Sequence, residues 1–169
     1  MRKEIDSVIK SDEDITIDNI KKIPYLDCII SEISRIYCSV PFTFQRKVTE
    51  DITVGGVTLT KGTLVDRSWI NFFFNEDTFE KPHQFIPERW EKEESKKHQH
   101  LVSLIFSSGP RSCIGKSLAM TEMKIMMIKV MQRYQNIQEL GPKPRIYDLP
   151  LSISVKNPQA VLFKRKKCD

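Results

Sequence analysis

The chain has 169 residues, of which 40% are hydrophobic and 29% are charged, and this length suits one ordinary domain with a core of its own. It contains no apolar run of about 18 residues and no signal-peptide pattern at its start, so neither a membrane span nor a secretion signal is predicted in it. The net charge of +5 comes partly from the basic run at 164–167, which is more typical of a solvated tail than of a nucleic-acid-binding arm. No nucleic-acid motif accompanies that run, although a weak attraction to an acidic protein surface or an anionic lipid stays open.

The cysteines and histidines lack the spacing of a zinc site, and no C-x-x-C pair is present. No disulfide framework is suggested either, and we expect a reducing compartment for this part of the chain. The residues concerned are Cys28, Cys38, Cys113, Cys168, His83, His98 and His100.

The start of the chain predicts two short helical segments. Ile5, Val8 and Ile9 share one side of a helix that ends near residue 10. Thr16 is a suitable N-cap for a second helix, which runs through residue 22 and is closed by Pro24. Because a domain that starts on a half-amphipathic helix is unusual, we expect further sequence upstream.

A longer helix is predicted over residues 25–37, where apolar side chains recur at helical spacing. Glu32 and Arg35 are three positions apart in it and can meet on one flank. Periodicity alone predicts a surface ion pair there, worth roughly a few tenths of a kcal/mol. The predicted apolar stripe consists of Leu26, Ile29, Ile30, Ile33, Ile36 and Tyr37.

Residues 41–65 are predicted as β structure, because Phe42, Phe44 and Arg46 alternate along the first part. Gly55-Gly56 is a strong signal for a two-residue hairpin turn, and Lys61-Gly62 supplies a further turn. Residues 67–75 then favour a short helix rich in aromatic side chains.

The remaining elements are predicted in a similar way. Residues 79–89 are irregular, and the charged stretch 91–100 is expected to be a surface loop. A long helix is predicted from just after Cys113 to about residue 134, because apolar residues keep to one broad face. The alternating runs 151–155 and 160–163 are expected to pair as a terminal β-hairpin.

The stretch 106–115 carries the clearest chemical signal. Cys113 lies between Gly109 and Gly115, two residues after Arg111, and directly before the predicted long helix. At a helix N-terminus, unpaired backbone N–H groups and the helix dipole favour a thiolate over a thiol. The cation of Arg111 adds to this effect, so the arrangement suits an anionic sulfur ligand. By itself, however, a lone cysteine is more often a small buried apolar residue.

Three motifs occur in order: E-x-x-R at 32–35, F-x-P-E-R-W at 85–90 and F-x-x-G-x-R-x-C-x-G at 106–115. Together these motifs resemble those of the haem-thiolate monooxygenases of the cytochrome P-450 family, and the resemblance covers the chain to about residue 165. Ala119 and Glu122 follow the last motif at the spacing of that family. The resemblance implies a mainly α fold with small β-sheets (α+β). It also implies one partial domain over residues 1–169, from the E-x-x-R helix to a C-terminal β-hairpin, equivalent to the haem-binding C-terminal part of that fold.

The resemblance also implies a role for each motif residue. Cys113 would be the axial thiolate ligand of the iron in haem b. Glu32, Arg35 and Arg89 would form a structural network that holds the cysteine loop. The resemblance implies a haem contact for Arg46, but a solvent-facing strand residue is an equally good interpretation of it. No catalytic residue is identified, because the acid–alcohol pair of the family's distal helix has no counterpart in this sequence. Haem contacts are implied for Arg111, Phe106, Gly109, Gly115 and Arg46.

The implied reaction inserts one oxygen atom of O2 into an organic substrate, with electrons from an NADPH-dependent reductase or another donor. By the resemblance, the protein would sit on the cytosolic face of the endoplasmic reticulum membrane, held there by a segment upstream of this chain. The chain as given would be cytoplasmic. The alternative is a truncated member of the family that lacks the distal oxygen-activating helix, binds haem weakly and is catalytically inactive. A basic interaction module without haem would explain only the terminal Lys/Arg run.

Overall fold

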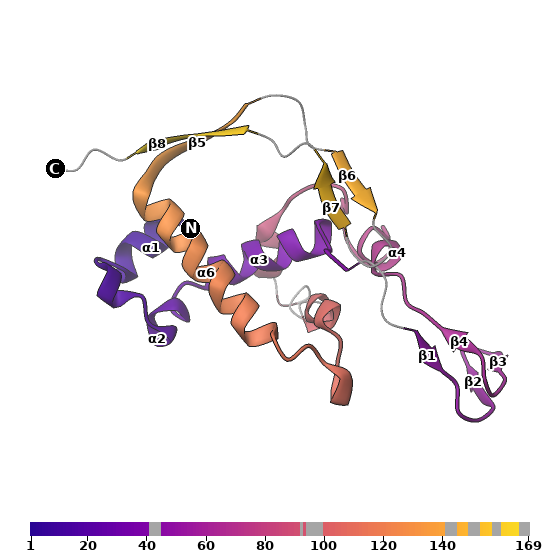
Figure 1. The fold of residues 1–169 in the computed structure, drawn as a ribbon. Coiled ribbons are helices and arrows are strands. Elements are labelled where there is room, and N and C mark those ends of the chain that lie inside the picture. Colours follow the sequence, from indigo (N-terminus) through magenta and orange to yellow (C-terminus); the bar gives the residue numbers. More distant parts are fainter. Residues whose placement is uncertain are drawn as a thin grey trace.

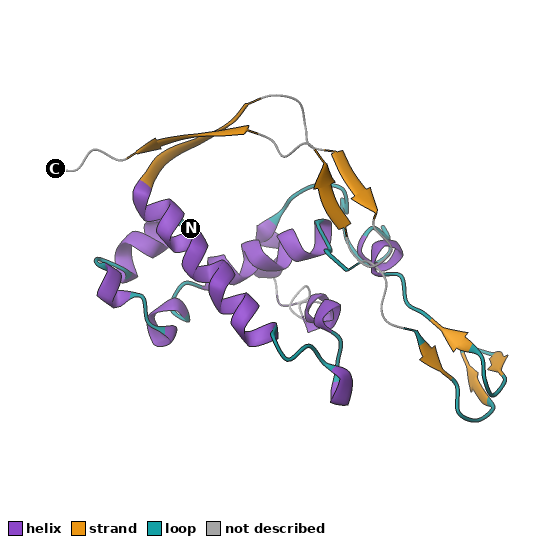
Figure 2. Ribbon diagram, viewed as in Figure 1, coloured by secondary structure: helices purple, strands orange, loops and turns teal. Residues whose placement is uncertain are grey.

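The structure is a computed structural model that describes residues 1–40, 45–91, 93, 100–140, 145–148, 153–156 and 160–165. Figure 1 shows α3 (Pro24–Ile36) and α6 (Lys116–Arg133) at the centre and a β-hairpin segment that projects away from them. The strands β5 (Tyr134–Leu140) and β8 (Ala160–Arg165) extend away from the C-terminal end of α6. Figure 2 shows the same division by element type, with helices inside and strands at the periphery.

Two short helices open the chain, as predicted. α1 (Arg2–Val8) is followed by a 3₁₀ turn at Asp12–Asp14 and by α2 (Ile17–Ile20). Thr16 caps α2, since its Oγ1 accepts a hydrogen bond from the backbone N–H of Asn19 at 3.3 Å. α2 ends at residue 20, two residues before the predicted end.

α3 (Pro24–Ile36) corresponds to the helix predicted over residues 25–37. Pro24 stands in its first turn, where a backbone N–H has no partner inside the helix. Leu26 and Ile30 are buried, as the apolar stripe predicts. They place one face of α3 in the core that it shares with α1, α2 and α6.

The predicted stripe is wrong at the C-terminal end of α3. Ile33 is 37% exposed and Tyr37 is 54% exposed, whereas Glu32 and Arg35 are both 0% exposed. The surface ion pair that periodicity favours is therefore a buried one. The reason is that this end of α3 packs against the 3₁₀ turn at Pro87–Glu91, which presents polar groups to it.

α3 lies between two clusters of buried side chains. The first cluster is aliphatic and joins α1, α2 and α3 to α6 (Lys116–Arg133), and the second is largely aromatic. The buried members are Ile5, Ile9, Ile20, Ile23, Leu26, Ile30 and Ile128 in the first, and Cys28, Cys38, Trp69, Phe73, Phe79, Trp90 and Val102 in the second.

The hairpin predicted at Gly55-Gly56 is confirmed. The two glycines have φ of +56° and +79°, and a type I′ turn requires positive φ at both positions. The predicted strand residues Phe42 and Phe44 lie outside the described residues. The antiparallel pairs of this segment are β1 (Arg46–Lys47) with β4 (Leu64–Val65), and β2 (Ile52–Val54) with β3 (Val57–Leu59).

The aromatic helix and the long helix are confirmed. α4 (Trp69–Phe73) lies inside the predicted range, and α6 ends at residue 133, close to the predicted end. Most of the charged loop predicted at 91–100 lies outside the described residues. Short 3₁₀ turns at Ser103–Phe106 and Gly109–Arg111 lead into α6.

The predicted C-terminal hairpin is wrong. β7 (Ile153–Lys156) and β8 (Ala160–Arg165) are strands, but β7 pairs with β6 (Arg145–Asp148) and β8 pairs with β5 (Tyr134–Leu140), both antiparallel. Alternation along a segment identifies a strand but does not identify its partner. β5 follows α6 without a loop, so the strand that β8 joins begins where the helix ends.

The predicted fold class is confirmed, because the described residues form a helical centre with small antiparallel sheets. Within the described ranges, no helix combines the length and the apolar character that a membrane crossing needs.

Candidate functional site

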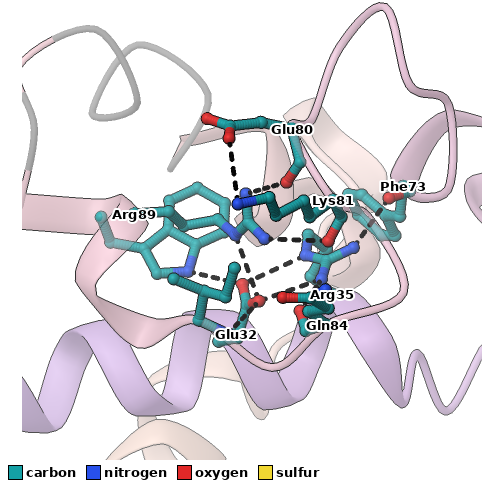
Figure 3. A network of polar contacts seen from close by, with 9 residues as sticks. Glu32, Arg35, Phe73, Glu80, Lys81, Gln84 and Arg89 are labelled. Atoms are coloured by element: carbon teal, nitrogen blue, oxygen red, sulfur yellow. Dashed lines mark hydrogen bonds and ion pairs between the residues drawn. The ribbon is translucent and has the colours of Figure 1, made fainter.

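A buried polar network joins α3 to the turn at Pro87–Glu91, with Glu32 at its centre (Figure 3). Arg35 donates to both carboxylate oxygens, from Nη2 to Oε1 at 2.9 Å and from Nε to Oε2 at 3.1 Å. Oε1 also accepts from the backbone N–H of Ile86 at 2.9 Å and from Nε of Arg89 at 3.1 Å. The structure thus brings together Glu32, Arg35 and Arg89, the three residues grouped by the sequence motifs.

Backbone carbonyls accept the remaining hydrogen bonds of the two arginines in this network. The guanidinium of Arg35 donates to the carbonyl oxygens of Phe73 at 2.8 Å and Gln84 at 3.2 Å. Arg89 donates in the same way to Glu80 at 2.8 Å and to Lys81 at 3.3 Å (Figure 3). Since one carboxylate faces two guanidinium groups, these oxygens satisfy the donors that Glu32 cannot reach. They also tie the segment between α4 and residue 89 to α3.

Aromatic rings enclose the guanidinium group of Arg35. Its central carbon lies 5.8 Å from the ring centroid of Phe74 and 5.4 Å from that of Phe79. Both distances are within the range of cation–π attraction. A planar guanidinium makes these contacts and the paired bonds to Glu32 together, which the ammonium of a lysine does not reproduce.

Burial and charge act in opposite directions on Glu32. Burial by itself raises the pKa of a carboxyl, because desolvation disfavours its charged form. Hydrogen bonds from Arg35 and from the Ile86 N–H, together with the charges of Arg35 and Arg89, outweigh burial and hold the pKa of Glu32 below its ordinary value. Glu32 is therefore a carboxylate at neutral pH.

Trp90 is a member of the network to which sequence reasoning assigned no role. Its indole Nε1–H donates to Oε2 of Glu32 at 2.9 Å, and its side chain is 1% exposed. The signal was its place directly after Arg89 in the F-x-P-E-R-W motif. A buried tryptophan needs an acceptor for its N–H, and the nearest buried carboxylate supplies it.

The cysteine loop has the geometry expected from its glycines. Gly109 has a φ of +69°, in the left-handed region, and Gly115 is the N-cap of α6. The backbone N–H of Cys113 donates to the carbonyl oxygen of Phe106 at 2.8 Å, which closes the loop. Ser107 has a φ of +62° and a ψ of −179°, a strained conformation for a residue other than glycine. At the end of this loop, Cys113 lies three residues before the first residue of α6.

The three described cysteines differ in accessibility. Cys28 and Cys38 are buried, and burial raises the pKa of both thiols, so neither suits a thiolate ligand. Cys113 is exposed and opens onto a pocket of about 460 Å³. The lining of this pocket is mostly apolar, with one basic side chain: Val40, Ile105, Phe106, Ser107, Arg111, Cys113 and Ile114.

Arg46 lies apart from this pocket. It is exposed on β1 and lines a different groove, together with Lys47 and residues of β2. The structure therefore brings Arg111 and Phe106 to Cys113 but does not place Arg46 in the same lining. No group of three or more potential metal ligands (His, Cys, Asp or Glu) occurs in the part of the chain that the structure describes.

Comparison with known proteins identifies the class. The cytochrome P-450 family model matches residues 1–163. The chain therefore belongs to the cytochrome P-450 family, whose members are haem-thiolate monooxygenases.

Relatives in the family include cytochrome P-450 4V2 of Mus musculus, which is 36% identical over 147 residues, with 82% of this chain and 27% of the relative covered. Cytochrome P-450 4V2 of Homo sapiens is 36% identical and covers 98% of this chain and 32% of its own length. Cytochrome P-450 4e5 of Drosophila mettleri, described as mitochondrial, is 35% identical and is covered over 23% of its length. The chain thus spans about a quarter to a third of these relatives.

Solved structures share the fold. A retinoic acid-bound cyanobacterial protein, CYP120A1, has a TM-score of 0.84 at 26% identity, with 98% of this chain and 38% of that chain covered. The haem domain of cytochrome P-450DA has a TM-score of 0.83 at 20% identity and covers 98% of this chain and 36% of its own.

The residues around Cys113 fit one face of a haem. Sulfur is a suitable ligand for haem iron, and the apolar side chains of Val40, Phe106 and Ile114 suit a porphyrin surface. Arg111 is the one basic side chain in this lining and would suit an anionic substituent at the edge of such a ring.

Proposed function

We propose that residues 1–169 form part of a single haem-thiolate domain in which Cys113 is the axial ligand of haem iron. The observation that carries the proposal is the exposed Cys113 thiol, which opens onto an apolar pocket at the start of α6. The family match over residues 1–163 supports the same role.

The chain's own residues would act on the haem in distinct ways. Cys113 would supply the sulfur ligand, Phe106 would shield it from water, and Arg111 would pair with a propionate. Gly109 and Gly115 would let the loop pass close to the ring, and Arg46 would be a further propionate partner if β1 approaches it. Haem of this kind supplies oxygen activation, for which an electron-rich thiolate ligand is favourable.

The buried network would support the ligand without touching the substrate. Glu32, Arg35 and Arg89 hold the segment before the cysteine loop against α3, so the loop would rest on a rigid base. The reaction we propose is insertion of one oxygen atom of O2 into an organic substrate, with electrons from an NADPH-dependent reductase. We propose a location at the cytosolic face of the endoplasmic reticulum.

The test is the carbon-monoxide difference spectrum of the haem-reconstituted, reduced chain. We expect a Soret band shifted to the red, as for thiolate-ligated ferrous haem, and its loss in Cys113→Ser. Cys28→Ala is the matched control, because Cys28 is buried in the aromatic cluster and its removal leaves Cys113 in place. A thiolate band that survives in Cys113→Ser would rule out the assignment.

A second proposal is that the chain alone binds haem weakly and does not oxidise substrate. It is favoured by the share of the relatives that the chain spans, 27% of the mouse protein, and by the exposure of Cys113. Loose haem, or a spectrum typical of a neutral thiol or a histidine ligand, would support this proposal.

A further inference from the structure

α3 carries the buried network and α6 starts at the cysteine loop, so the contact between these helices sets where Cys113 lies. Ile30 of α3 and Ile128 of α6 belong to the same buried cluster, with Met120 and Met123 partly buried against it. Methionine side chains are flexible and adapt to different neighbours, so an interface built on them specifies a helix position weakly.

A small cavity lies between the two helices and the cysteine loop. It has a volume of about 150 Å³, and Ile30, Phe106, Lys116 and Met120 are among the residues that line it. Apolar packing therefore does not fill the space between α3 and the first turns of α6. A directional contact would add to the definition of that end of the helix.

Asp27 and Lys124 provide such a contact. Nζ of Lys124 on α6 lies 2.5 Å from Oδ1 of Asp27, in the first turn of α3. The Lys124 side chain is 16% exposed and that of Asp27 is 39% exposed, so the pair is partly shielded from water. Coulomb attraction is stronger in such a site than between fully exposed charges.

The ion pair connects the helix that carries the buried network to the helix that follows Cys113. Lys124 is eight residues beyond Lys116, the first residue of α6, which corresponds to about 12 Å of helix. Asp27 is five residues before Glu32 on α3. We propose that Asp27 and Lys124 are positioning residues, which fix the N-terminal half of α6, and with it Cys113, relative to the buried network. The functional consequence rests on the role proposed for Cys113.

α6 offers a matched control pair. Lys129 forms an ion pair with Asp12, also at 2.5 Å, but the side chains are 45% and 77% exposed. This second pair ties α6 to the 3₁₀ turn between α1 and α2, away from α3. Its removal deletes the same charge from the same helix without affecting the contact between α3 and α6.

The test is the distance between nitroxide labels on Cys113 and on a Tyr37→Cys variant, measured by pulsed electron paramagnetic resonance in the haem-free full chain with Cys168→Ser. Cys28 and Cys38 are 6% and 2% exposed, so we expect labelling at the two exposed cysteines only. We expect Lys124→Gln and Asp27→Asn each to shift or broaden the distance distribution. The exchange of Asp27→Lys with Lys124→Asp should restore it, and Lys129→Gln should leave it unchanged.

Several outcomes would overturn the proposal: an unchanged distribution in both single variants, no restoration by the exchange, or equal broadening by Lys129→Gln. If Lys124→Gln does not fold, Asp27→Glu keeps the charge and moves it by one methylene. A shifted mean distance then supports the proposal, and an unchanged mean counts against it.

The haem spectrum of the unlabelled protein separates this inference from the proposed function. We expect Lys124→Gln to weaken haem-thiolate binding about threefold to tenfold, as for the loss of one partly shielded ion pair. If the parent chain shows no thiolate band at all, the proposed function fails. The label distances still decide whether Asp27 and Lys124 position the loop.

Discussion

Glu32 accepts hydrogen bonds from its own helix, from the backbone at Ile86 and from Arg89 and Trp90 on the following turn. Because every one of these bonds favours the ionised carboxylate, protonation of this one group weakens the whole network. The ionisation of a single side chain thus couples pH to the attachment of the 87–91 turn to α3.

This coupling predicts a stability difference that depends on pH. The folded pKa of Glu32 is below its ordinary value of 4.5, so the unfolded chain takes up this proton first on acidification. Stabilisation by Glu32 is present in full well above pH 4.5 and is lost as the pH falls through the folded pKa. At pH 7 we expect Glu32→Gln to lower the free energy of unfolding by about 3–5 kcal/mol, and this difference to shrink below the ordinary pKa.

Urea unfolding of both proteins across the acidic range measures the difference. Glu76→Gln is the control, because Glu76 is exposed. A difference between Glu32→Gln and the parent chain that stays constant or grows on acidification would contradict the assigned direction of the pKa shift.

Trp90 and Trp69 form a natural comparison at the same scale. Both are buried in the aromatic cluster, but Nε1 of Trp90 donates to Glu32, whereas Nε1 of Trp69 has no hydrogen-bond partner. Trp90→Phe should therefore lower the free energy of unfolding by about 1–2 kcal/mol more than Trp69→Phe, since only the former removes a bond to a charged group. Equal losses in denaturant unfolding would show that the bond to Glu32 contributes nothing beyond packing.

At the scale of elements, the hairpin of β2 and β3 depends on the conformation of two glycines. Apart from the two adjacent residues, no part of the described structure lies within 4 Å of the position of a Cβ at Gly55 or Gly56, so a larger side chain there meets no steric contact. The conformational demand is the positive φ alone, which side chains other than glycine and asparagine adopt at a cost.

Gly55→Ala should therefore destabilise the hairpin by about 1–2 kcal/mol, and Gly55→Asn by less. Hydrogen exchange of the amides in β2 and β3 measures this effect locally, with protection expected to fall by roughly 5–30-fold in the alanine variant. Equal protection in the alanine and asparagine variants would argue against a type I′ turn.

α3 shows why a correctly predicted element can have the wrong buried face. Its length and its first apolar positions follow from periodicity and from Pro24. Its last turn buries Glu32 and Arg35 and exposes Ile33, because the neighbour there is a polar turn rather than an apolar helix. The family resemblance grouped these two residues with Arg89, which periodicity could not do.

At the scale of the whole molecule, the pairing of the C-terminal strands is the clearest departure from the prediction. Gln138 of β5 is paired with Leu162 of β8 in the antiparallel register. Cysteines placed at these two positions should form a disulfide on mild oxidation, because directly opposed residues in an antiparallel pair bring their Cβ atoms within bonding range.

The comparison is a cysteine pair at Ser154 and Leu162, which a hairpin of β7 with β8 would bring close. Mass spectrometry of proteolytic fragments after oxidation identifies the linked peptides. Efficient linkage of the second pair and none of the first would contradict the observed pairing.

Local spacing and residue type were enough to predict the main helices, the glycine turn, the motif residues and the family, because few other structures or chemistries require those patterns. They did not predict which strands pair, that Trp90 donates to Glu32, or that Asp27 of α3 forms an ion pair with Lys124 of α6. Arg111 and Phe106 belong to the same short motif as Cys113 and line its pocket, whereas Arg46, far away in the chain, does not. Contacts between residues far apart in the chain depend on how elements pack, and neither periodicity nor composition specifies that packing.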